Sequence, residues 1–175
     1  MATRTAAAGG VIAWVILGLV GTLAGPGAVQ NLSFAISALG LVTGGALLSI
    51  CYFRAGATTV AAGFALLVLA ESHGLGLAAG GSAAIASVGT SAALYIPGLL
   101  FVSLPPAFPV LGRITGLLAA LAFAALASLY AIGTHVDPAH PLAGAGYALM
   151  SVAAFVWVYA SLKSGENKGF GRLVS

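Results

Sequence analysis

The chain consists of long apolar stretches separated by short segments that contain charges, glycine or proline. The stretches are close to the roughly 20 residues that an α-helix needs to cross a bilayer. They do not alternate apolar and polar residues as a transmembrane β-strand does. The pattern predicts an all-α integral membrane protein, a six-span helical bundle with short loops. The expected spans run from about Ala8 to Ala24, Val29 to Phe53, Ala57 to Gly76, Ala83 to Leu104, Ile114 to Ile132 and Pro141 to Leu162.

Lysine and arginine test this span count independently, because they collect in the cytoplasmic loops of membrane proteins. With six spans and the N-terminus inside (N-in/C-in), all six basic residues fall on the cytoplasmic side. The three outer connections, 25–28, 74–82 and 133–140, contain no lysine or arginine. We therefore expect residues 1–162 to form the bundle and residues 163–175 a short basic cytoplasmic tail. The six residues are Arg4, Arg54, Arg113, Lys163, Lys168 and Arg172.

Composition excludes several classes of protein. The chain is 61% hydrophobic and only 5% charged, whereas soluble domains carry about a quarter of charged residues. The net charge of +3 is explained by topology, and no basic patch with interleaved aromatic residues indicates a nucleic-acid partner. The expected location is a bacterial inner membrane, with lipid and other membrane subunits or further copies of this chain as partners.

Small and aromatic residues predict how the helices pack. The segment GLVTG (40–44) has the GxxxG spacing that brings helix backbones close together in lipid. Glycine and alanine occur in every span, which favours tight packing with little room for a wide cavity. Five aromatic residues are expected near span ends, as anchors at the membrane interface. They are Trp14, Trp157, Tyr52, Tyr130 and Tyr159.

All three histidines and two of the three acidic residues lie on the predicted outer face. Glu71 and His73 end the third span, and His135, Asp137 and His140 lie between the fifth and sixth spans. One interpretation is a metal site for zinc or copper, since imidazole and carboxylate groups are common ligands of both. A second is a site linked to protons or quinone, because an acid near the hydrocarbon core is a functional hypothesis by default. Glu71 is expected about one turn from the interface, within reach of water, with His73 as a possible partner.

A third interpretation is structural. Outer loops need polar residues, and Asp137 or His140 can cap the sixth helix. Mid-span lysines and deeply placed histidines are absent from the sequence, which disfavours a retinal Schiff base and helix-buried haem ligands.

The leading functional hypothesis is a non-catalytic integral subunit of a larger inner-membrane complex, in contact with lipid, pigment or quinone. The alternative is a small permease or channel for a metal ion, proton or small solute, with the outer Glu and His residues as its entrance. A membrane enzyme with a metal at the outer face is a third hypothesis, and the sequence favours a protein that is not an enzyme.

Overall fold

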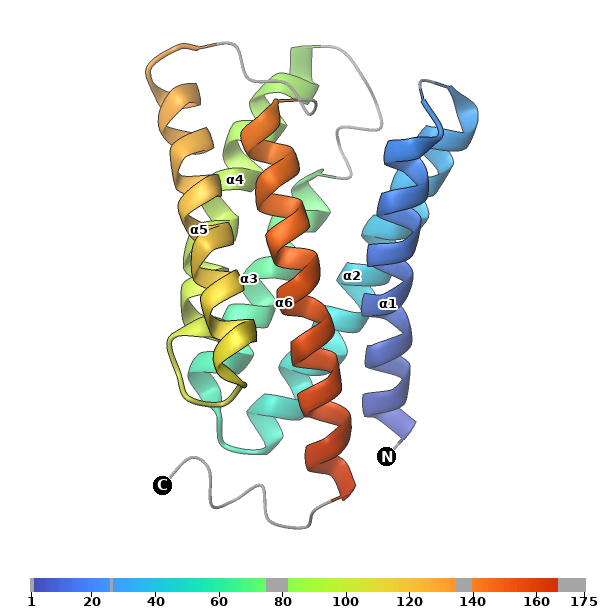
Figure 1. The fold of residues 1–175 in the computed structure, drawn as a ribbon, viewed down its shortest axis with the longest axis vertical. Helices are drawn as coiled ribbons and strands as arrows, with labels where there is room; N and C mark the ends of the chain where they lie inside the picture. The colour runs from blue at the N-terminus through green and yellow to red at the C-terminus, as the bar shows by residue number, and fades with distance from the viewer. Residues whose placement is uncertain (1, 26, 75–81, 135–139, 167–175) are drawn as a thin grey trace.

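The computed structural model describes residues 2–25, 27–74, 82–134 and 140–166, and these residues form six α-helices and no strands. The helices follow the chain in alternating directions, and the start of α1 and the end of α6 lie at the same end of the bundle (Figure 1). The bounds are α1 Ala2–Leu23, α2 Ala28–Arg54, α3 Thr58–Gly74, α4 Ser82–Ser103, α5 Val110–Ala131 and α6 Pro141–Glu166.

The helices form a closed ring in chain order. Each helix packs against the next one along the chain, and α6 returns to contact α1. The interior of the ring is filled by large side chains, including Phe64, Leu99, Phe123 and Met150. The outer surface carries exposed large apolar side chains on each of the six described helices, including Leu69 on α3.

Four helical segments are long and apolar enough to cross a bilayer: α1, α2, α5 and residues Pro141–Lys163 of α6. The apolar stretches Thr58–His73 and Val88–Ser103 are shorter. At about 1.5 Å per residue, the 17 residues of α3 span about 25 Å, which is less than the roughly 30 Å hydrocarbon core. The structure thus confirms a six-helix bundle, and four of its helices are candidate membrane spans.

Glycines set the closest helix contacts, as the GxxxG spacing predicted. A Cβ atom built on Gly40 would lie 2.6 Å from the carbonyl oxygen of Gly10, and one built on Gly44 would lie 2.8 Å from that of Ala7. Real Cβ atoms essentially never approach a backbone atom so closely. Gly40 and Gly44 therefore allow the backbones of α1 and α2 to touch.

Candidate functional site

The carboxyl group of Glu71 lies inside the helix ring. Its side chain is only 9% exposed, although it belongs to the last turn of α3. The expectation that Glu71 lies within reach of water at the interface is therefore wrong. The reason is that α3 is short and ends below the upper end of α4 (Figure 1), so its last turn is still surrounded by neighbouring helices.

Three aromatic side chains from three other helices surround this carboxyl group. The Tyr95 hydroxyl of α4 donates a hydrogen bond to Oε2 of Glu71. The side chain of Trp14 on α1 lies close enough to Glu71 to affect its carboxyl group, and Tyr147 on α6 lies beside Tyr95. We refer to Trp14, Glu71, Tyr95 and Tyr147 as the Glu71 cluster.

Close packing of α3 on α4 sets the pairing of Glu71 with Tyr95. A Cβ on Gly63 would lie 2.9 Å from the carbonyl oxygen of Gly98, and one on Gly98 would lie 2.9 Å from Cδ2 of Leu67. Residues four apart lie on the same face of a helix. Following that face from Gly63 through Leu67 brings Glu71 opposite Tyr95, about one turn before Gly98 on the antiparallel α4.

The position of Trp14 is set by the α1–α2 contact. The Ser37 hydroxyl donates a 2.7 Å hydrogen bond to the carbonyl oxygen of Trp14. A Cβ on Gly40 would lie 3.0 Å from the backbone nitrogen of Trp14, so the glycine brings the two backbones together at this level. The indole of Trp14 is buried and extends across the interior of the helix bundle towards Glu71 on α3.

An aromatic wall supports the other side of the cluster. Tyr95 stacks on Phe123 of α5 with ring centroids 4.7 Å apart, and Tyr147 meets both rings edge-on at 5.8 and 5.3 Å. A Cβ on Gly146 would lie 3.0 Å from the Phe123 ring, so glycine leaves space for that ring. These contacts restrict the two tyrosine rings and hold the Tyr95 hydroxyl against Glu71.

The polar side chains found beside Glu71 among the described residues are Tyr95 and Trp14. Its polar neighbours there are a phenol and an indole, which can donate hydrogen bonds but carry no positive charge. A tyrosine hydroxyl can donate one hydrogen bond and accept others. Tyr95 and Tyr147 can therefore relay a proton towards or away from the carboxyl group.

The five residues of the predicted outer-face site have different positions. Glu71 is buried, whereas His73 is exposed two residues later. His140 caps α6, where its Nδ1 accepts a 3.3 Å hydrogen bond from the N–H of Leu142, in agreement with the structural interpretation. His135 and Asp137 lie outside the described residues. Among the residues described, no three His, Cys, Asp or Glu side chains come together, and the zinc or copper site stays a prediction.

The interfacial role expected for Trp14, Tyr52 and Trp157 is wrong, since all three side chains are buried in the bundle. Sequence reasoning also missed Tyr95, the partner of Glu71. The available signal was a tyrosine hydroxyl in the middle of an apolar span, because a polar group at that depth needs a partner just as an acid does.

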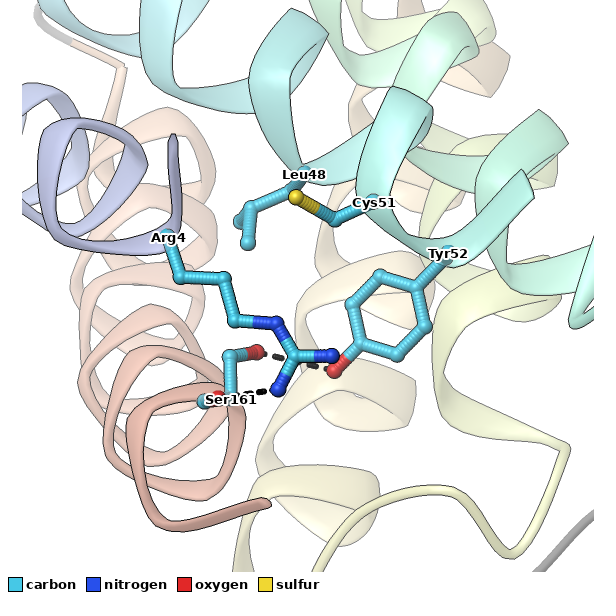
Figure 2. A pocket seen from close by; sticks show the side chains of 5 residues that line it. All are labelled: Arg4, Leu48, Cys51, Tyr52 and Ser161. Atoms are coloured by element: carbon cyan, nitrogen blue, oxygen red, sulfur yellow. Dashed lines mark hydrogen bonds between the residues drawn. The ribbon is translucent and has the colours of Figure 1, made fainter. Parts of the chain in front are cut away.

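A second polar site closes the opposite end of the bundle (Figure 2). Nη1 of Arg4 donates a 3.2 Å hydrogen bond to the carbonyl oxygen of Ser161, which joins the start of α1 to α6. The Ser161 hydroxyl donates to the carbonyl oxygen of Trp157 at 2.7 Å. Its single proton is thereby used, so Tyr52 donates the 2.8 Å bond to the Ser161 hydroxyl. Arg4, Tyr52 and Ser161 line a small pocket together with Leu48 and Cys51.

Comparisons of the chain with protein-family models, with curated proteins and with solved structures found no match.

Proposed function

We propose that this chain is a small six-span permease of a bacterial inner membrane, and that the ion it transports is the proton, bound at Glu71. The observation that carries the proposal is the burial of Glu71 among Tyr95, Trp14 and Tyr147 at the centre of an apolar bundle. In this proposal the bound ion lies at a site enclosed within the helix ring, whereas the outward-facing entrance expected from the sequence stays a prediction.

The distribution of basic residues supports an N-in/C-in orientation. Arg4 and Arg113 lie in the first turns of α1 and α5, Arg54 ends α2, and Lys163 lies near the end of α6. These helix ends are all at the lower end of the bundle in Figure 1. Positive charges at one end favour placing that end in the cytosol.

The energetics of burial support a proton as the bound ion. Taking an ionised carboxylate out of water costs several kcal/mol, and a neutral donor such as the Tyr95 hydroxyl offsets only part of that cost. A proton neutralises the charge without requiring additional space. Among the described residues the interior is filled by buried side chains, and the pocket beside the cluster is lined by apolar ones, which favours a proton over a larger solute.

Proton permeation is tested in liposomes that contain a trapped pH-sensitive dye. We expect wild-type protein to dissipate an imposed pH gradient faster than empty vesicles, and Glu71→Gln to abolish this effect. Glu166→Gln, the same change at the end of α6, is the matched control and should retain the activity. Wild-type flux equal to that of empty vesicles, or full flux in Glu71→Gln, would contradict the proposal.

The second candidate is the non-catalytic integral subunit of a larger membrane complex. It is favoured by the glycine-mediated contacts, which make the bundle a compact packing unit with an apolar exterior. The mass of the native particle after extraction in mild detergent tests this candidate. Co-purification of other membrane subunits at fixed stoichiometry would support it, and a particle that contains only this chain would count against it.

A further inference from the structure

Two pockets that share the side chain of Leu48 lie between the end of the bundle that holds Arg4 and the Glu71 cluster. The mouth pocket is the one in Figure 2, lined by Arg4, Leu48, Cys51, Tyr52 and Ser161. The inner pocket lies deeper among α1, α2, α3 and α6, and its lining includes Trp14, Leu48, Leu67, Met150 and Trp157. Leu48 lines both pockets.

The inner pocket borders the Glu71 cluster on three helices. Trp14 lines the pocket and also lies beside Glu71. Leu67 lies one turn before Glu71 on α3, and Met150 lies about one turn after Tyr147 on α6. A water molecule in the inner pocket would therefore be separated from the carboxyl group by little more than one layer of side chains.

The two pockets differ in chemistry. The mouth pocket offers the Arg4 guanidinium and the hydroxyl groups of Tyr52 and Ser161, which can hold water. The inner pocket is lined by aliphatic and aromatic side chains, and apolar cavities of this kind stay dry. Leu48, which is fully buried, lies between the polar mouth pocket and the apolar inner pocket.

We propose that the two pockets form a water path that carries protons from the Arg4 end of the bundle to Glu71, with Leu48 as its hydrophobic constriction. This inference rests on the proposed role of Glu71 and assigns the route by which its proton arrives. Hydrophobic constrictions control conduction by wetting and dewetting. When the constriction wets, water delivers a proton to the Glu71 carboxylate, whose other titratable neighbours are Tyr95 and Tyr147. Arg4, Cys51 and Tyr52 are the ionisable groups at the mouth.

Hydrogen–deuterium exchange of the Glu71 carboxyl group tests the path. The C=O stretching band of this group is identified in infrared spectra of the lipid-reconstituted protein as the band that Glu71→Gln removes. Its shift after transfer into D2O measures how fast water reaches the site. We expect Leu48→Ser to speed this exchange at least about tenfold, which corresponds to a barrier lower by about 1.4 kcal/mol.

The matched control is Leu39→Ser, which makes the same change on a lipid-facing position of α2 and should leave the exchange rate unchanged. Leu48→Ala, which widens the constriction without adding a polar group, is the second variant if Leu48→Ser does not fold. Equal rates in wild type and the Leu48 variant, or equal acceleration in the Leu39 control, would overturn the path.

The path and the permease proposal fail in different ways. If the exchange rate of the Glu71 carboxyl group depends on Leu48 but the liposomes show no proton flux, the path is supported and the transport function is rejected. If proton flux depends on Glu71 but the exchange rate of its carboxyl group is unchanged in the Leu48 variants, the transport function is supported and this route is rejected.

Discussion

The Tyr95 hydroxyl on α4 donates a hydrogen bond to Oε2 of the buried Glu71 on α3. The two residues are 24 positions apart in the chain and lie on helices that pack through Gly63 and Gly98. This pair joins the fold to the proposed chemistry, because the glycine contact that packs the helices also sets the partner of the acid.

Removal of this hydroxyl should weaken both stability and proton movement. Tyr95→Phe keeps the stacking on Phe123 but takes a hydrogen bond from a buried carboxyl group, a loss of about 1–3 kcal/mol. We expect the free energy of unfolding in mixed micelles to fall by that amount and Glu71-dependent flux to slow. Tyr159→Phe, on an exposed position of α6, is the control and should change neither. A Tyr95→Phe protein with wild-type stability and flux would show that the bond has no role.

The α1–α2 contact should tolerate no side chain at Gly40. Gly40→Ala forces a Cβ against the backbone of α1, and overpacking of this kind costs about 1–3 kcal/mol. Gly9→Ala is the control, because a Cβ at Gly9 meets no atom within 4 Å and alanine favours a helix by up to about 1 kcal/mol. In detergent, the thermal unfolding temperature of Gly9→Ala should therefore equal or exceed that of wild type, and the temperature of Gly40→Ala should be lower. The opposite order would contradict this account of the contact.

The orientation can be read from two single-cysteine variants in a Cys51→Ala background. Thr58 is exposed at the end of the bundle that holds the described basic residues, and Thr134 is exposed just after α5 at the other end. A membrane-impermeant maleimide added to intact cells should label Thr134→Cys and leave Thr58→Cys unlabelled until the cells are permeabilised. Labelling of Thr58→Cys in intact cells would reverse the topology.

The histidine that follows Glu71 should be dispensable for proton movement. His73 is exposed, and the polar contacts of Glu71 are with Tyr95 and Trp14. We therefore expect His73→Ala to conduct protons at the wild-type rate in liposomes. Loss of flux in this variant would support the predicted partnership between His73 and Glu71.

Apolar patterning predicted the number and order of the helices but not all of their ends. Hydropathy marks the apolar part of a helix, whereas α1 begins at Ala2 and includes the polar residues Thr3 to Thr5. The helix α5 begins at Val110, four residues before the expected Ile114. Arg113 in its first turn donates hydrogen bonds to the carbonyl oxygens of Ser103 and Leu104, and this tertiary contact has no signature in the sequence.

The site was only partly predictable for a related reason. Helices that are apolar on all sides give no periodic signal for which face points inward. The rarity of acids in the spans identified Glu71, but its depth depends on the length of α3 relative to its neighbours. Trp14 and Tyr95 become its partners only through the glycine contacts at Gly40 and Gly98.

The most direct test of the central claim is an infrared pH titration of the reconstituted protein. The account predicts a C=O band of a protonated carboxylic acid that Glu71→Gln removes, Glu166→Gln keeps and Tyr95→Phe shifts, because the shift reports the lost hydrogen bond. If the wild-type protein shows no such band, or if the band persists in Glu71→Gln, Glu71 is not the proton-binding group.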